Sequence, residues 1–251
     1  MIEQNSTENR QALIRPAVAM QEGAGAQVKR LFPLSGWMNF DPFVLFDDFS
    51  IAPGSGFPEH PHRGFEAITY LFEGSIEHKD NLGNHSTVGA GGAQRFTAGS
   101  GLVHSEMPAD KGLSRGIQLW INLPQRLKAL PPSYQQVDSK QIPEQRFNGG
   151  VRRIIVGQDS PVTLNTETRY EEIKLDAGAQ LSENIDPGYR GFIYLVTGEI
   201  SANGHTLRSG EAYYLDEVEK LSTRATKPSH FMLCLGRAHG EPIRQRGPFV
   251  D

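Results

Sequence analysis

The hydrophobic positions of the chain fall into short runs rather than long helical stripes. Three of these runs are VLFDDFSI (Val44 to Ile51), AITYLFEGSIEH (Ala67 to His78) and GIQLWINL (Gly116 to Leu123). Each is rich in β-branched and aromatic residues and is bounded by Gly, Pro, Asn or Asp, which is typical of β-strands. Twenty-seven glycines and sixteen prolines are spread along the chain and indicate many turns. The pattern therefore predicts a β-rich protein.

The pattern also occurs twice. The run ITYLFEGSIEH, from Ile68 to His78, resembles FIYLVTGEISA, from Phe192 to Ala202, and the shared Tyr, Leu, Gly and Ile positions are separated by a constant 124 residues. Further along, AGGA at 90–93 resembles SGEA at 209–212. A strand, turn and strand unit that occurs twice indicates a duplicated β-domain.

Two polar segments suggest the domain boundaries. Residues 1–13 are polar and are expected to form a flexible N-terminal segment. The segment 124–145 is polar, has no sustained period and contains the prolines Pro124, Pro131, Pro132 and Pro143, so we expect it to be a connector. The predicted domains are then 14–123 and 146–251.

Charge and cysteine content limit the classes of function. The net charge is only −4 and no run of Lys or Arg exceeds a pair, which argues against direct nucleic-acid binding. The single cysteine, Cys234, lies in the apolar run FMLCLG and is expected to be a buried free thiol, which fits a reducing cytoplasm. No stretch reaches the roughly 18 apolar residues of a membrane span, and the polar start does not resemble a signal peptide. These features predict a soluble, cytoplasmic protein.

Candidate metal ligands lie in two segments. GFPEHPHRGFE places His60 and His62 at positions i and i+2 of an extended segment, where side chains share a face. TAGSGLVHSEMP places His104 and Glu106 at the same spacing after a glycine-rich turn. Three imidazoles and a carboxylate suit Fe(II), Mn(II), Cu(II), Ni(II) or Zn(II), and no thiolate is present to select a softer ion.

The second copy serves as an internal control. The 124-residue offset and, for the later motif, a shifted register place Asn184, Asp186, Thr223 and Ala225 at the corresponding positions. The second copy thus keeps the scaffold residues and loses every candidate ligand, which indicates that the histidines do not serve the fold.

The remaining histidines are expected to have no part in a metal site. His78 and His85 flank the turn KDNLGN and are predicted to be exposed to solvent. His205, His230 and His239 match no ligand position.

These motifs carry a family resemblance. HPHRGFEAITYLFEG, followed by TAGSGLVHSEMP and GIQLWINL, resembles the pirin family of the cupin superfamily. IRPAV (14–18), VLFDDF (44–49) and GEPIRQRGPFV (240–250) extend the likeness to nearly the whole chain. The resemblance implies an all-β fold of two face-to-face cupin (jelly-roll-like) β-barrels with few short helices. It also implies a metal, usually iron, in the N-terminal barrel and none in the C-terminal one.

The resemblance places the family's ligands on His60, His62, His104 and Glu106. Glu66 competes for the carboxylate position, because many cupins have a ligand Glu shortly after the second His. That ligand normally stands seven residues before the glycine that is Gly74 here, which is Ala67, so Glu66 is one residue out of register and should face the other way. We therefore expect Glu106 to be the ligand and Glu66 to be a supporting or structural carboxylate.

Aromatic residues near these motifs suggest a pocket. Phe57, Phe65 and Trp120, with Gln118, are expected to line an apolar cavity with a few orienting polar groups, and Arg63 is expected beside the site.

The resemblance further implies a flavonol 2,3-dioxygenase (quercetinase) activity that acts on a small planar phenol and dioxygen. Catalysis would then depend on Glu106 and His62. The metal would most simply be iron, with manganese, nickel, copper or zinc as alternatives, and the protein is expected to be a monomer.

Two other readings stay open. In one, the protein is a non-enzymatic iron-binding regulator whose redox state changes its affinity for a protein partner. An exposed charged patch near the metal would favour this reading, and Arg63, Lys111 and Arg115 are the candidates for it. In the other, the two barrels are purely structural, which would give no reason to keep four ligands in one of them.

Overall fold

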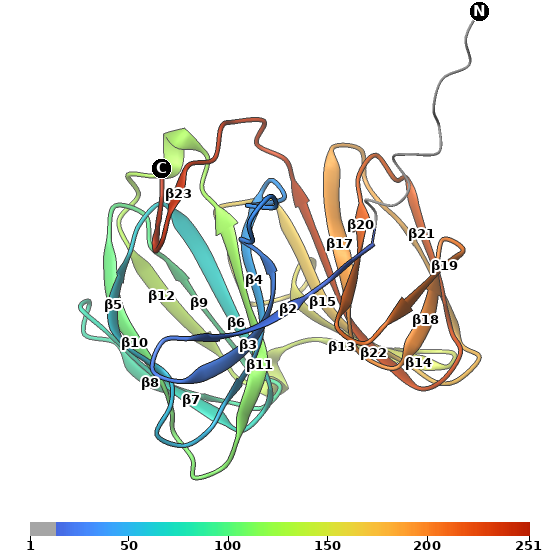
Figure 1. Ribbon diagram of the computed structural model, residues 1–251, viewed down its shortest axis with the longest axis horizontal. Coiled ribbons are helices and arrows are strands. Elements are labelled where there is room, and N and C mark those ends of the chain that lie inside the picture. The colour runs from blue at the N-terminus through green and yellow to red at the C-terminus, as the bar shows by residue number, and fades with distance from the viewer. Residues whose placement is uncertain (1–13) are drawn as a thin grey trace, which may run out of the picture.

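The fold consists of two β-barrels that lie side by side. The computed structural model describes residues 14–251, so the predicted flexible segment 1–13 lies outside the described residues. Figure 1 shows the N-terminal barrel in blue to green and the C-terminal barrel in yellow to red. The helices of residues 14–251 are two short 3₁₀ turns, η2 (Gln125–Leu127) and η3 (Ser139–Gln141). Among these described residues, no helix is long and apolar enough to cross a membrane.

The first barrel is built from a seven-stranded and a four-stranded antiparallel sheet. The larger sheet has the order β12-β9-β6-β11-β4-β3-β2 and the smaller one β5-β10-β7-β8. Their bounds are β2 Val18–Glu22, β3 Ala26–Phe32, β4 Phe43–Ile51, β5 Phe57–His62, β6 Phe65–Glu73, β7 Ser75–Asp80, β8 His85–Gly89, β9 Ala93–Thr97, β10 Leu102–Pro108, β11 Ser114–Asn122 and β12 Ser133–Val137.

The second barrel repeats this arrangement. Its larger sheet has the order β1-β20-β17-β22-β15-β14-β13 and its smaller one β16-β21-β18-β19, while β23 and β24 form a separate pair. Their bounds are β1 Ile14–Pro16, β13 Glu144–Phe147, β14 Gly150–Val156, β15 Thr168–Leu175, β16 Gln180–Asn184, β17 Tyr189–Thr197, β18 Glu199–Ala202, β19 His205–Arg208, β20 Glu211–Leu215, β21 Lys220–Ala225, β22 Ser229–Arg237, β23 Gln245–Arg246 and β24 Phe249–Val250. The matching strand orders confirm the predicted duplication and the all-β, two-barrel fold.

The two barrels exchange terminal segments. β1, near the start of the described chain, pairs with β20 and occupies in the second sheet the place that β12 has in the first. The segment with β23 and β24 lies against the first barrel instead, as the red C-terminal end in Figure 1 shows. There Val250 is fully buried among residues that include Phe65. The approach is so close that a Cβ atom at Gly64, which has a φ of +86°, would lie 1.8 Å from the carbonyl oxygen of Val250.

The segment 124–145, which the sequence predicts to be a connector, contains secondary structure. It contains β12, which pairs with β9 in the first large sheet and sets Tyr134 opposite Phe96. Most residues of β12 are only half-buried, because it is an edge strand. Because its sequence is polar and flanked by prolines, the hydrophobic pattern does not predict this strand.

The large sheets pack face to face, and their contact surface forms a core shared by both halves. Two reciprocal hydrogen bonds cross it: the Tyr70 hydroxyl donates to Glu172 at 2.8 Å, and the Tyr194 hydroxyl donates to Asp48 at 2.9 Å. Both the tyrosines and the carboxylates are related by the 124-residue offset. The interface is therefore nearly two-fold symmetric, as an isologous contact between two copies would be.

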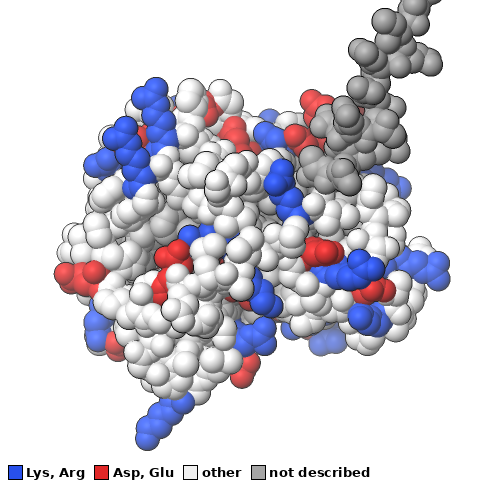
Figure 2. All heavy atoms as spheres, in the orientation of Figure 1, with Lys and Arg blue, Asp and Glu red and all other residues white. Residues whose placement is uncertain are grey.

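Charges of both signs are mixed on the surface. On the face shown in Figure 2, Lys and Arg side chains lie among Asp and Glu side chains, in keeping with the net charge of −4. The absence of direct nucleic-acid binding stays a prediction, which rests on the small net charge and the lack of long Lys or Arg runs.

Candidate metal centre

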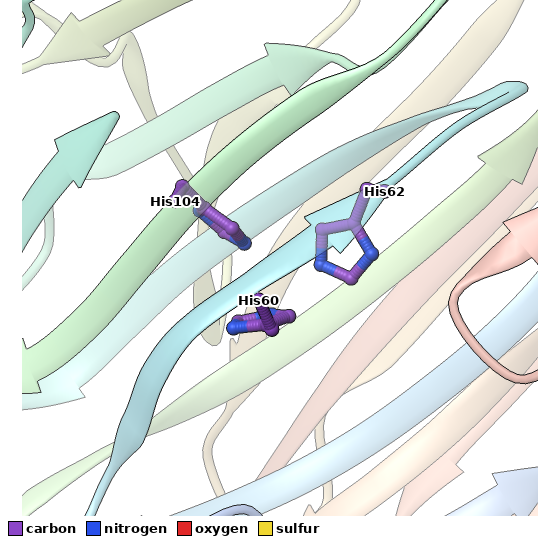
Figure 3. Close-up of side chains that lie close together, drawn as sticks. All are labelled: His60, His62 and His104. Carbon is purple, nitrogen blue, oxygen red and sulfur yellow. The ribbon is translucent and has the colours of Figure 1, made fainter. Parts of the chain in front are cut away.

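Three histidines meet inside the first barrel. β5 and β10 are paired so that His104 stands opposite His60 and Leu102 opposite His62. Because alternate residues of a strand share a face, both segments direct these imidazoles to one side. Figure 3 shows the three rings turned toward one another, two from β5 and one from β10. The ring centroids are 4.5 Å apart for His60 and His62, 4.6 Å for His60 and His104, and 4.9 Å for His62 and His104.

The Nδ1 atom of each ring has a neighbour within hydrogen-bond distance. Nδ1 lies 2.7 Å from the Pro58 carbonyl oxygen in His60 and 3.4 Å from the Pro248 carbonyl oxygen in His62. In His104 the buried Nε2 atom has no hydrogen-bond partner. One nitrogen from each ring lies within 4.8 Å of the others. An orphaned ring nitrogen inside such a cluster fits a metal ligand, since buried polar atoms otherwise find partners.

Electrostatics keep two of the rings neutral. Burial lowers the pKa of His62 to about 3, with a smaller contribution from neighbouring His60. Burial, followed by the nearby histidines, also lowers the pKa of His104 well below its usual value. Neutral imidazole is the form that binds metals, so these rings are ready to act as ligands.

Glu106 lies on the same inward face of β10 as His104. Its carboxylate accepts hydrogen bonds from Thr69 Oγ1 at 2.9 Å, from Gln118 Nε2 at 2.8 Å and from Gln94 Nε2. Three neutral donors fix the orientation of the carboxylate, and an ionised carboxylate has further lone pairs for an ion. Ligand atoms of Glu106, His104 and His78 lie within 4.8 Å of one another, so Glu106 adjoins the three-histidine cluster through the shared His104.

Glu66 faces away from this cluster. It is fully buried and accepts hydrogen bonds from Thr97, from the backbone and side chain of Asn165, and from Thr166. Asn165 and Thr166 precede β15 of the second barrel, so Glu66 lies at the interface between the halves. This is the orientation expected from its strand register.

A pocket of about 550 Å³ opens beside the histidines, and Phe57, Gln118 and Trp120 line it as predicted. Phe65 instead stacks behind Trp120, with ring centroids 4.1 Å apart, and is fully buried. Arg63 does not line the pocket, because it is exposed and donates to Asp251 at 2.8 Å.

Other parts of the pocket wall were not predicted. Arg30 donates to both carboxylate oxygens of Asp47, at 2.8 Å and 2.6 Å, and to Glu22 at 2.7 Å. Gln245 and Pro248 come from the C-terminal segment. No sequence motif indicated that residues so far apart would share one cavity.

The prediction that His78 is exposed is wrong, whereas His85 is exposed as expected. The His78 side chain is fully buried, its Nε2 atom lies 3.1 Å from Asp80 Oδ2, and its Nδ1 atom lies 3.4 Å from His104 Nδ1. Its ring stacks on Tyr134 of β12, with centroids 4.0 Å apart. The burial of His78 follows from this cover by β12, a strand that the local sequence does not predict.

Strand pairing corrects the positions assigned in the second barrel. Ile76 pairs with Pro108, and its counterpart Ile200 pairs with Ala225, so Ala225 corresponds to Pro108 rather than to Glu106. Counting along the paired strands gives the positions equivalent to His60, His62, His104 and Glu106, which are Glu183, Ile185, Leu221 and Thr223.

Asn184 and Asp186 therefore do not occupy the histidine positions. The turn from Ile185 to Tyr189 is one residue longer than the turn from His62 to Phe65. Residues before this turn are therefore separated from their equivalents by 123 positions, and residues after it by 124. The conclusion that the second barrel has no histidine at these positions stands.

Two cupin-type barrels packed face to face, with a histidine and glutamate cluster in one of them, define a two-barrel cupin with a candidate metal centre in its N-terminal half. The sequence matches the family described as Pirin over residues 25–121 and the Pirin C-terminal cupin domain over residues 170–251. It is 38% identical to Pirin-like protein 2 of Arabidopsis thaliana over 93% of this chain and 77% of that protein. It is also 38% identical to Pirin of Homo sapiens over 91% of this chain and 83% of that protein. The chain belongs to the pirin family.

Solved structures share the fold. A quercetin 2,3-dioxygenase from Acinetobacter baumannii superposes with a TM-score of 0.86 at 29% identity, covering 94% of this chain and 90% of that one. A bacterial pirin from Escherichia coli, solved in complex with nickel(II), gives a TM-score of 0.75 at 23% identity, covering 90% of this chain and 98% of that one.

Proposed function

We propose that this protein is a metal-dependent dioxygenase that acts on flavonol-type planar phenols, similar to quercetin 2,3-dioxygenase. The observation that carries the proposal is the cluster of three histidines, with Glu106 beside His104, next to a largely apolar pocket of about 550 Å³. A cavity of this size is typical of small-molecule sites. The overall similarity to a quercetin 2,3-dioxygenase supports the same reading.

The proposed ligands are His60, His62, His104 and Glu106. The orphaned Nε2 atom of His104 and the inward-facing carboxylate of Glu106 support this assignment. Three nitrogen donors and one oxygen donor suit iron, and also manganese, nickel, copper or zinc. When bound, such an ion supplies a Lewis acid that lowers the pKa of a coordinated hydroxyl, together with open positions for further ligands.

The pocket residues would bind and orient the substrate. Phe57 and Trp120 offer apolar surfaces to a planar ring, and Gln118 reaches the same cavity while it holds Glu106. Glu106 lines the pocket, so its carboxylate can accept the proton of a substrate hydroxyl within hydrogen-bond reach. His62 lies in the same wall and fixes one side of the cluster.

The decisive experiment compares metal content and oxygen consumption with quercetin. The metal-loaded wild type is expected to consume oxygen, and His62→Ala is expected to lose both metal and turnover. His85→Ala, which changes an exposed histidine of the same barrel, is the control and should retain both. No turnover by metal-loaded wild type would refute the dioxygenase reading, and equal turnover by His62→Ala would refute the assigned site.

The same experiment addresses the regulator reading. Of the three charges that would favour it, Arg63 is already bonded to Asp251, which reduces its availability to a protein partner. If the protein binds metal without consuming oxygen, and partner binding changes with the redox state of the metal, the protein is a regulator instead.

A further inference from the structure

The three histidines of the cluster have their Nδ1 atoms occupied in two different ways. For His60 and His62 the neighbour of Nδ1 is a backbone carbonyl oxygen, from Pro58 and Pro248. A carbonyl oxygen only accepts hydrogen bonds, so it fixes the proton on Nδ1 and leaves the lone pair on Nε2. For His104 the neighbour is the Nδ1 atom of another histidine, His78.

A ring nitrogen can either donate or accept, so the state of His78 decides the state of His104. If the His78 Nδ1 atom accepts, His104 carries its proton on Nδ1 and keeps a lone pair on the buried Nε2 atom, which faces the cluster. If the His78 Nδ1 atom donates, His104 must accept there, and its proton then lies on the nitrogen that a metal needs.

Asp80 settles which of these forms His78 adopts. The Asp80 side chain is fully buried and its Oδ2 atom lies 3.1 Å from His78 Nε2. Its Oδ1 atom accepts from the backbone nitrogens of Leu82 and Asn84, both at 3.0 Å, and the Asn84 side chain donates to both oxygens. A carboxylate surrounded by these donors acts as an acceptor, so His78 donates from Nε2, and in the neutral ring Nδ1 then accepts.

We infer that His78 is a positioning residue for the metal centre: held by Asp80, it accepts the Nδ1 proton of His104 and so directs the His104 Nε2 lone pair to the metal. His78 thus fixes the proton on Nδ1 of His104, as the Pro58 and Pro248 carbonyl groups do for His60 and His62. The inference rests on the proposed metal site and adds the residues that prepare one of its ligands.

Tyr134 supports the same arrangement from the edge strand β12. Its ring covers His78, and its hydroxyl donates to Gln94 Oε1 at 2.9 Å, while the Gln94 side-chain amide donates to Glu106. Tyr134, which is not a proposed ligand, therefore contacts both His78 and Gln94, the side chains that position the two proposed ligands on β10.

The second barrel lacks this arrangement together with the ligands. At the 124-residue offset, which holds for the strand pair that includes β7 and β18, Ala202 replaces His78 and Gly204 replaces Asp80. A merely structural histidine and aspartate pair would have equal reason to appear in both barrels.

The first test needs no metal. Long-range ¹H–¹⁵N NMR correlations of the metal-free protein report which ring nitrogen of each histidine is protonated. We expect protonated Nδ1 in His104 and protonated Nε2 in His78. A proton on Nδ1 of His78 would overturn the inference, whether or not the protein proves to be a dioxygenase.

The second test measures the affinity for Co(II) by competition with a chelator, together with the visible absorption spectrum of bound Co(II). Asp80→Asn keeps an oxygen for the turn but presents amide protons to His78, and His78→Leu removes the acceptor beside His104. Each is expected to weaken binding by about 10- to 100-fold, the usual effect of removing a group that supports a ligand, and to change the spectrum. His78→Asn, which restores an oxygen near the position of Nδ1, should recover part of the affinity.

The matched control is Glu77→Gln, which alters the exposed His85 and Glu77 pair on the same hairpin, 2.8 Å apart. It should bind Co(II) as the wild type does. If Asp80→Asn folds and binds Co(II) with unchanged affinity and spectrum, the inference is wrong. A metal-bound ¹⁵N shift at His78 Nδ1 in Zn(II)-loaded protein would also refute it, because His78 would then be a ligand. If the wild type binds no metal, both the proposed function and the role of His78 as a positioning residue are wrong. If it binds Co(II) with the expected tautomers but does not consume oxygen with quercetin, only the proposed dioxygenase function fails.

Discussion

The two barrels have the same strand order, but the interior of the first is polar at positions where the interior of the second is apolar. Where the first has His62 and His104, the second has Ile185 and Leu221, both buried in its apolar core. The equivalents of Thr69, Gln94 and Gln118, the three donors to Glu106, are also members of that core: Ile193, Tyr213 and Leu233.

The comparison teaches that the polar groups of the first barrel form one set. A buried polar side chain costs free energy unless it finds a partner. The proposed ligands and their supporting donors are therefore present together in the first barrel and absent together from the second. Among the positions equivalent to the four candidate ligands, one carries a charge in the second barrel. Glu183, at the position of His60, accepts hydrogen bonds from Arg169 at 2.6 Å and from Arg152. Its negative charge is balanced by these two arginines, which hold the carboxylate in the wall of the barrel.

The largest effect is expected when a ligand is replaced by its counterpart. His104→Leu puts the residue of the second barrel into the first and should reduce metal affinity by more than about 100-fold, since it removes a direct ligand rather than a supporting group. The free energy of unfolding of the metal-free protein should not fall, because the change buries an apolar side chain. Chelator competition and urea unfolding measure the two quantities, and tight equimolar metal binding by the variant would contradict the ligand assignment.

The interface carboxylates are expected to respond to acid in opposite ways. Burial raises the pKa of Glu172, but His230, whose Nε2 atom lies 2.9 Å from Glu172 Oε1, lowers it to about 2 together with Lys174 and Tyr70. Its stabilising contribution is therefore present above the unfolded pKa of 4.5 and is lost as the pH falls toward 2. For Asp48, burial outweighs the hydrogen bond from Tyr194 and raises the pKa, so ionised Asp48 opposes folding and that cost disappears in acid.

Urea unfolding between about pH 5 and pH 2 tests this contrast. Glu172→Gln should flatten the loss of stability in acid by up to about 3 kcal/mol, whereas Asp48→Asn should steepen it. Equal pH profiles for the two variants would show that the near-symmetric interface is also electrostatically symmetric.

The interface tyrosines should differ less strongly. Tyr194→Phe leaves buried Asp48 without its hydrogen bond and is expected to cost about 2 kcal/mol, whereas Tyr70→Phe leaves Glu172 with His230 at 2.9 Å and is expected to cost about 1 kcal/mol. Denaturant unfolding at neutral pH provides both values. The reverse order would mean that His230 contributes little.

The smallest effect concerns a single supporting donor. Gln118→Leu, which introduces the residue of the second barrel, removes one of the hydrogen bonds to Glu106 and should weaken metal binding by about tenfold. Chelator competition measures the change, with Gln118→Glu as a harsher variant that sets two carboxylates side by side. Unchanged affinity in Gln118→Leu would mean that Thr69 and Gln94 suffice.

The sequence predicted the strands that are buried on both sides, because their apolar runs leave few alternatives. It also predicted that Glu66 faces away from the histidines, since counting along a strand determines the face. The location in the cytoplasm, the monomeric state and the domain boundaries stay predictions.

Burial and register across a turn were harder to predict. His78 lies beside a polar turn, and only the cover by Tyr134 from β12 makes it a buried residue. One extra residue in the turn after Ile185 moved the equivalents of His60 and His62 by one position, and no local pattern signals such an insertion. Pocket residues from the C-terminal segment are set by long-range packing, which the sequence alone does not specify.

The exchange of terminal segments gives the metal pocket an order of assembly. During synthesis the histidines of β5 and β10 emerge long before Pro248 and Val250, which supply a carbonyl oxygen for His62 and a buried anchor near Phe65. A newly made first barrel thus has the proposed ligands but lacks part of the pocket wall until the second barrel has also been made. If the proposed site holds an ion, its loading is expected to depend on completion of the whole molecule, because each barrel is completed by a segment from the other half of the chain.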